Sequence, residues 1–150
     1  MSGDSSRNGE SEYCDNDACL LVKIDEFGAG NIVGNIGTRL RAQGGTAPWV
    51  GLRLAEEYFN HPTDSPIDPT LADCQSTYVI VIGDGVWNNS HHAPALIRAQ
   101  NLFAAGIKVY TVAYGDGISP GALDRFDELA KAGGTDGVIV ASDGNALKIE

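Results

Sequence analysis

Basic residues are scarce in this sequence. Its 150 residues include 10 Lys and Arg against 20 Asp and Glu, which gives a formal net charge of −10 at pH 7. Because no cluster of Lys or Arg is present to follow a phosphate backbone or an anionic bilayer, nucleic acid and membranes are poor candidate partners. Apolar runs such as residues 78–82 are far too short to cross a bilayer. The first residues are neither basic nor apolar, so we expect no signal peptide in this chain.

Cysteine is also rare, with Cys14, Cys19 and Cys74 as the three thiols. An odd and small number of cysteines excludes a disulfide-stapled scaffold. Three arrangements stay open: a Cys14–Cys19 bridge in an oxidising compartment, free thiols, or a link from either residue to Cys74. Two cysteines with four residues between them and no matching pair make a poor zinc site.

Complete enzyme signatures are missing. The sequence has no G-x-S-x-G elbow, and Cys74 precedes an expected strand, which argues against a serine or cysteine hydrolase. The run Gly28-Ala29-Gly30-Asn31-Ile32-Val33-Gly34 approaches a dinucleotide loop, but its third glycine is one residue late. A metal hydrolase needs more converging carboxylates and histidines than Asp84 supplies. We therefore expect no enzymatic activity, with a Rossmann-like metal- or nucleotide-dependent enzyme as the alternative.

The sequence does hold enough apolar material, 43% of residues, for one sizeable core. Residues 1–19 are different, because they carry five acids against Arg7 and offer Tyr13 as their one large apolar side chain. Such a stretch cannot bury enough surface to offset its ordering entropy. We expect an acidic flexible arm or loop at residues 1–19 and a folded domain at residues 20–150.

Hydrophobic periodicity and turn signals predict an α/β domain. Thr46 is the expected N-cap of a helix that has Pro48 in its first turn, and Ser119-Pro120 opens another helix in the same way. The predicted helices cover residues 31–43, 46–60, 93–105 and 120–132, and the predicted strands cover residues 20–24, 78–82, 107–114 and 138–141. This alternation predicts a three-layer, Rossmann-like parallel sheet flanked by helices on both faces. Residues 78–82 are expected as its central strand, buried on both faces.

Ligands of such sheets bind beyond the carboxyl ends of the strands. Asp84 directly follows the central strand and lies between two glycines. Three roles fit its carboxylate: a ligand of a hard cation, a general base, or a cap of the turn. The Thr46 hydroxyl either caps its helix or reaches a metal ion. Asp116 and Asp143 follow the next two strands and are read as turn and N-cap residues, and His91-His92 as part of a solvated loop.

The order of three segments resembles a von Willebrand factor A domain, in particular that of type IV pilus tip-associated adhesins of the PilY/PilC type. The segments are the helix start Gly44-Gly45-Thr46-Ala47-Pro48, the loop Ser65-Pro66-Ile67, and the stretch from Cys74 through the strand to Gly83-Asp84-Gly85. The resemblance covers roughly residues 20–145. It implies the α/β fold already predicted from the periodicity.

The resemblance also implies a metal-ion-dependent adhesion site. Its family ligands are a D-x-S-x-S loop, a threonine of the G-G-T segment and an aspartate of a T-D-G segment, and the last two correspond to Thr46 and Asp84. Gly83 stands where the family usually has threonine. No D-x-S-x-S is present, because Asn8 replaces the second serine in the nearest match, Asp4-Ser5-Ser6-Arg7-Asn8. We therefore expect an incomplete domain that binds Mg²⁺ or Ca²⁺ weakly.

An adhesion site of this kind leaves one coordination position of the ion open to a carboxylate of the partner. The resemblance thus implies a non-enzymatic adhesion or pilus-biogenesis module at a bacterial surface, extracellular and pilus-associated. Its expected partners are a protein ligand, a host or surface receptor, or pilus subunits. A purely structural pilus domain without a working metal site is a further alternative.

Overall fold

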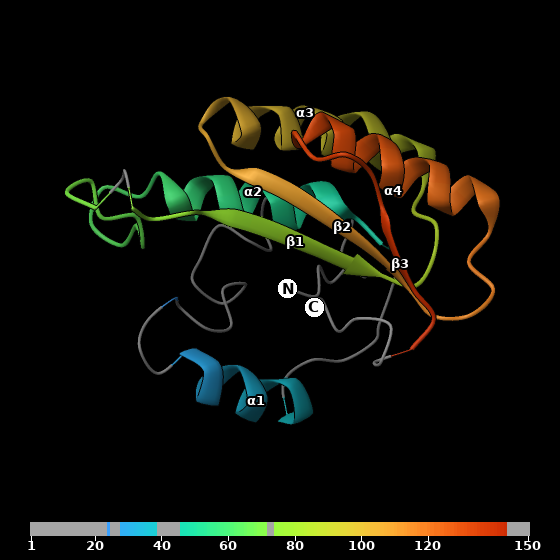
Figure 1. Ribbon diagram of the computed structural model, residues 1–150, viewed down its shortest axis with the longest axis horizontal. Coiled ribbons are helices and arrows are strands. Elements are labelled where there is room, and N and C mark those ends of the chain that lie inside the picture. Colours follow the sequence, from blue (N-terminus) through green and yellow to red (C-terminus); the bar gives the residue numbers. More distant parts are fainter. Residues whose placement is uncertain (1–23, 25–27, 39–45, 72–73, 144–150) are drawn as a thin grey trace. The chain divides into compact units, whose positions relative to one another are not determined.

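The computed structural model describes residues 24, 28–38, 46–71 and 74–143 (Figure 1). The chain divides into two compact units, Met1–Gln75 and Ser76–Glu150, and each is described by itself. The expected acidic arm at residues 1–19, with Cys14 and Cys19, lies outside the described residues. The strand expected at residues 20–24 does too, apart from Ile24, which lies in a bend.

The described part of the first unit has two helices. Helix α1 (Gly28–Thr38) begins three residues earlier than predicted, and helix α2 (Pro48–Phe59) ends one residue earlier. The N-cap of α2 is Ala47, which makes no side-chain capping bond, so the prediction that Thr46 caps this helix is wrong. Because proline suits the first helical position, where no N–H is needed, Pro48 places the N-cap at the residue directly before it. The apolar side of α2 is buried at Val50, Leu52, Leu54, Ala55 and Phe59.

A proline-rich loop follows α2, and its own side chains hold its backbone. The Ser65 hydroxyl donates to the carbonyl oxygen of Phe59 over 2.6 Å. The Gln75 side chain closes the loop by donating to the Pro66 carbonyl oxygen and accepting from the Asp68 amide, each over 3.0 Å. Residues 61–69 form neither helix nor strand.

The second unit is a parallel α/β arrangement. Its elements are β1 (Tyr78–Gly83), α3 (Asn89–Ala104), β2 (Lys108–Tyr114), α4 (Pro120–Ala132) and β3 (Ile139–Ala141). The sheet has the order β1-β2-β3, with Tyr78 opposite Lys108 and Val112 opposite Ile139. The predicted parallel pairing of the strands at residues 78–82 and 107–114 is therefore confirmed, and the fold is α/β with helices flanking a parallel sheet.

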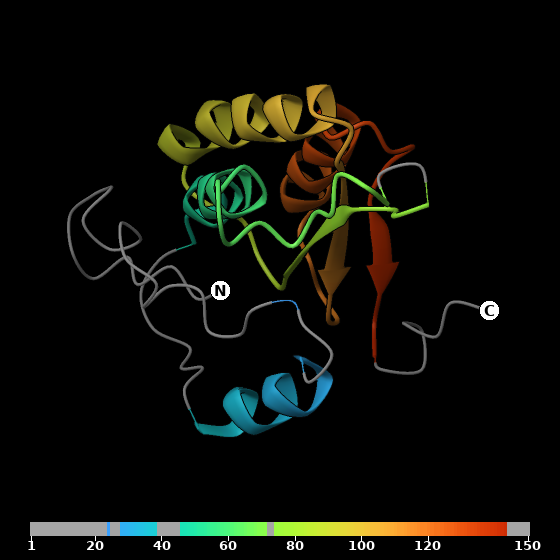
Figure 2. The same ribbon diagram turned by 90° about the vertical axis from the view of Figure 1, so that its left-hand side faces the viewer.

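Helices α3 and α4 lie on the same face of this sheet. Both contact β2 and each other, and both lie on one side of the strands in Figures 1 and 2. The strand order explains this arrangement: successive right-handed crossovers that move across the sheet in one direction place their helices on one face.

Strand β1 has one exposed face. Its side chains at Tyr78, Ile80 and Ile82 are 55%, 53% and 62% exposed, and the intervening residues are half-buried. The expectation that this strand is buried on both faces is therefore wrong. A continuous apolar run allows burial on both faces but does not supply the second layer of structure.

The core of the second unit lies between β2 and α4. Phe126 and Leu129 of α4 are almost fully buried, as is Thr111 of β2, whose hydroxyl donates to the Phe126 carbonyl oxygen over 2.9 Å. The ring of Trp87 meets the ring of Phe126 edge to face, with centroids 5.0 Å apart. Helix α4 begins as predicted, because the Ser119 side chain accepts a hydrogen bond from the first turn. Phe126 is thus the central side chain beneath the carboxyl end of β1.

Candidate functional site

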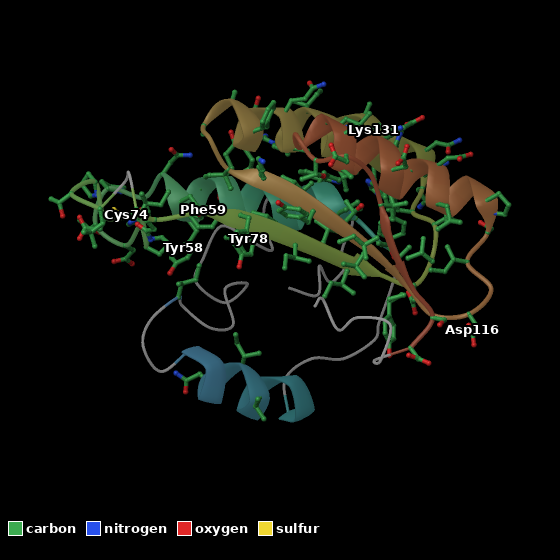
Figure 3. The ribbon with its side chains drawn as sticks, viewed as in Figure 1. Tyr58, Phe59, Cys74, Tyr78, Asp116 and Lys131 are labelled. Atoms are coloured by element: carbon green, nitrogen blue, oxygen red, sulfur yellow. The ribbon has the colours of Figure 1, made fainter. Side chains whose placement is uncertain are left out.

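Three aspartates follow the three strands of the second unit. Asp84 comes directly after β1, and Asp116 and Asp143 come two residues after β2 and β3. Because parallel strands end at the same edge of a sheet, these residues belong to one edge, and Figure 3 shows Asp116 in the loop beyond β2. All three residues are exposed.

Asp84, like Asp116, is exposed and has no partner among the described residues. Its carboxylate forms no hydrogen bond or ion pair with the residues that the structure describes, although it lies in a bend between two glycines. By contrast, Asp68 accepts hydrogen bonds from the Thr70 hydroxyl and amide over 2.7 and 2.8 Å, which lower the pKa of its carboxyl. The described contacts therefore show no capping of the turn by Asp84, and its oxygens are open to a ligand from solution.

Gly83 sets the backbone position of Asp84. A Cβ atom on Gly83 would lie 2.9 Å from Cζ of Phe126, closer than ordinary carbon contacts. The strand can therefore pass over Phe126 only because residue 83 has no side chain. This contact gives a physical reason for glycine at the position where the family resembled by the sequence usually has threonine.

The segment after Asp84 is fixed to α4 by a hydrogen-bonded arginine. The guanidinium of Arg125 donates to the Trp87 carbonyl oxygen and to Oδ1 of Asn89, the first residue of α3. A planar guanidinium with two bonded N–H groups holds both acceptors in one geometry. Sequence reasoning missed this role of Arg125, because its acceptors lie 38 and 36 residues away along the chain.

His91 and His92 lie in α3, so the interpretation of this pair as a solvated loop is wrong. Helix α3 begins four residues earlier than predicted and includes Pro94. His92 has its Nε2 atom 2.6 Å from Oε2 of Glu128, and its ring lies 5.9 Å from that of Trp87. The buried Nδ1 of His92 and Nε1 of Trp87 have no hydrogen-bond partner among the described residues. These contacts make His92 part of the packing between α3 and α4.

The two predicted metal ligands belong to different units. Thr46 is exposed and lies two residues before α2, in Met1–Gln75, whereas Asp84 lies in Ser76–Glu150. Hydroxyl and carboxylate oxygens are ligands that Mg²⁺ and Ca²⁺ accept. Among the described residues, however, no group of three or more His, Cys, Asp or Glu side chains could hold a metal ion. The donor set therefore fits such an ion only in part, and the assignment of Thr46 and Asp84 stays a prediction.

Two further observations concern the described parts of the chain. Cys74 is exposed and forms no disulfide there. None of the described helices combines the length and apolar character that a membrane span needs.

Comparisons with known proteins support the fold. No protein-family profile matches the chain, and no curated protein matches it significantly. Among solved structures, the chain is similar to the structure of proximal thread matrix protein 1 (PTMP1) from the mussel byssus, with a TM-score of 0.58 and 20% sequence identity. The match covers 82% of this chain but 29% of the mussel protein, so the chain spans less than a third of that protein. The likeness shows an α/β fold consistent with the Rossmann-like, von Willebrand factor A-like class.

Proposed function

We propose that this chain is a non-enzymatic adhesion module that binds a protein partner at the sheet edge beyond β1. The observation that carries the proposal is Asp84, an exposed carboxylate without a partner among the described residues, at the carboxyl end of a parallel strand. The fold class supports this assignment, and so does the byssus matrix protein as a structural neighbour. The sequence resemblance adds the setting: an extracellular, pilus-associated bacterial surface and a protein, receptor or pilus subunit as partner.

In this proposal, a Mg²⁺ or Ca²⁺ ion joins the module to its partner. Asp84 supplies the anionic ligand and Thr46 a neutral hydroxyl, which leaves the ion electrophilic toward a carboxylate of the partner. Because few protein ligands are available, the affinity for the ion alone should be weak, about millimolar as in weak extracellular calcium sites. No bond is made or broken in the partner, so no catalytic residue is assigned.

The experiment titrates Mn²⁺, which is paramagnetic, into ¹⁵N-labelled protein and follows the broadening of backbone amide signals. We expect broadening to concentrate at residues 83–85 and at Thr46, at about millimolar ion. Asp84→Ala should abolish this broadening. Asp116→Ala, which removes an exposed carboxylate from the neighbouring strand end, is the matched control and should leave it unchanged.

Two results would overturn the metal site. Equal broadening around Asp84 and Asp116 would show weak association of ions with any carboxylate at this edge. An Asp84→Ala variant that broadens like the wild type would show that Asp84 is no ligand. A structural pilus domain without a working metal site would then be the better assignment.

A further inference from the structure

Strand β1 is an edge strand of the described sheet. It pairs with β2 on one side, and the described residues place no strand on its other side. Its sequence, Tyr-Val-Ile-Val-Ile-Gly, has no charge and no proline over six residues. Natural proteins commonly use charges, prolines or bulges to block the unpaired N–H and C=O groups of an edge strand. The described sheet has none of these in β1, so this edge is able to accept another strand.

The exposed face of β1 extends the apolar surface beside that edge. Val79 and Val81 are in register with Val109 and Thr111, which are buried, so the alternate side chains of β1 project to the face without α3 and α4. Those alternate side chains are Tyr78, Ile80 and Ile82, which are all more than half exposed. Figure 3 shows Tyr78 projecting from β1 on the side opposite the two helices. An apolar face continuous with an open edge marks an interaction surface.

We infer that β1 pairs with β1 of a second copy of this chain, antiparallel about a two-fold axis perpendicular to the sheet. The two three-stranded sheets would then form one continuous sheet. With this axis, the exposed faces of the two copies lie on the same side of the joined sheet. Each residue of β1 must then lie opposite a residue whose side chain projects to the same face. The central register of this kind places Ile80 opposite Ile80 of the second copy, and Tyr78 opposite Ile82.

Self-complementarity favours a second copy over an unrelated partner. In the central register, each aromatic or branched side chain of the exposed face meets another one, and such cross-strand pairs stabilise antiparallel ladders. A two-fold axis makes every favourable pair occur twice, as in isologous dimers.

The charges at the two ends of β1 are compatible with this pairing. Asp84 follows β1 at one end, and Lys108 lies opposite Tyr78 at the other end. Antiparallel pairing brings the Asp84 end of one copy to the Lys108 end of the other. The two Asp84 residues would lie eight positions apart along the ladder, or about 27 Å at about 3.4 Å per residue, which exceeds the Debye length at physiological salt. The like charges of the two copies therefore stay apart in this register.

The expected association is weak, because one short strand from each copy buries less surface than a standard stable interface. Sedimentation velocity should show a monomer–dimer equilibrium between about 10 µM and about 1 mM protein, a range suited to small interfaces. The measurement is made in EDTA, so that ion bridging through Asp84 cannot contribute. A failure of the dimer proposal is thereby distinguishable from a failure of the metal-site proposal.

Ile80→Lys tests the central pair. It places two ammonium groups opposite each other at the axis and should raise the dissociation constant at least about tenfold. Ile97→Lys is the matched control, because Ile97 on α3 is 55% exposed and Ile80 is 53% exposed. This variant should associate like the wild type. Ile80→Thr keeps a branched strand residue and should weaken association by about threefold, which gives a second variant if the lysine disturbs folding.

A mixture of Ile80→Lys and Ile80→Glu proteins identifies the geometry. Each variant alone should stay monomeric, and the mixture should form a heterodimer, because opposite charges then face each other across the axis. A wild type that is monomeric up to about 1 mM overturns the proposal, since the edge is then covered in another way. Equal weakening by Ile97→Lys, or a mixture that does not associate, shows that β1 does not pair with itself and overturns it too.

Discussion

Replacing Gly83 by threonine, the residue usual in the resembled family, should destabilise this chain. The Cβ atom would lie 2.9 Å from Cζ and 3.5 Å from Cε1 of the Phe126 ring. That ring is 1% exposed and packs edge to face on Trp87, so it has little room to recede. Overpacking of this kind costs about 1–3 kcal/mol. The better strand propensity of threonine returns up to about 1 kcal/mol, so we expect a net loss of about 1–2 kcal/mol in the free energy of unfolding.

A double-mutant cycle with Phe126→Leu isolates this contact. Urea unfolding gives the free energy of unfolding for the wild type, both single variants and the double variant. Because leucine lacks the ring atoms that the new side chain would meet, Gly83→Thr should cost less in the Phe126→Leu background, by about 1 kcal/mol. If Gly83→Thr is as stable as the wild type, or if the two changes are additive, the steric explanation for Gly83 is wrong.

Three smaller perturbations test other contacts of the second unit. Thr111→Val removes the hydroxyl that donates to the Phe126 carbonyl oxygen, and should lower the free energy of unfolding by about 1 kcal/mol in urea titrations, whereas Thr111→Ser should lose less of this bond. Ser119→Ala removes the cap of α4 and should lower the thermal midpoint by an amount equivalent to about 1 kcal/mol. The hydrogen bond from Lys131, 2.6 Å away, lowers the pKa of Asp127, so this pair stabilises the fold above the ordinary pKa of Asp and loses that effect as pH falls through the lowered pKa. Asp127→Asn should therefore show a smaller loss of stability between pH 5 and pH 2 than the wild type in acid-unfolding curves, and equal slopes would contradict this assignment.

Local signals in the sequence predicted much of the second unit. Ser119-Pro120 combines an N-cap with a first-turn proline, and the structure begins α4 at Pro120. The alternation of apolar strands with helices predicted parallel pairing, and the observed ends of β2 and β3 lie within one residue of the prediction. These features depend on neighbouring residues, so the sequence carries them directly.

Other features depend on contacts that sequence spacing does not record. Thr46 is a good capping residue, yet Pro48 moves the cap to Ala47. The polar residues before Pro94 read as a loop, yet α3 includes them and its first turn is bound by Arg125 of α4. At the candidate site, the position of Asp84 after β1 was predicted, whereas its lack of described partners depends on the surrounding fold.

The apolar run of β1 shows most clearly where sequence reasoning ends. Five consecutive apolar residues predicted burial on both faces, and the structure covers one face and leaves Ile80 and Ile82 more than half exposed. The pattern indicates that the strand favours an apolar environment on both faces. It does not indicate which chain provides the apolar contacts of the second face. A second copy supplies a matching strand for the open edge without any further sequence signal, because the same residues serve both partners. The mixture of Ile80→Lys and Ile80→Glu proteins therefore tests whether the apolar run of β1 serves contact with a second copy of the chain.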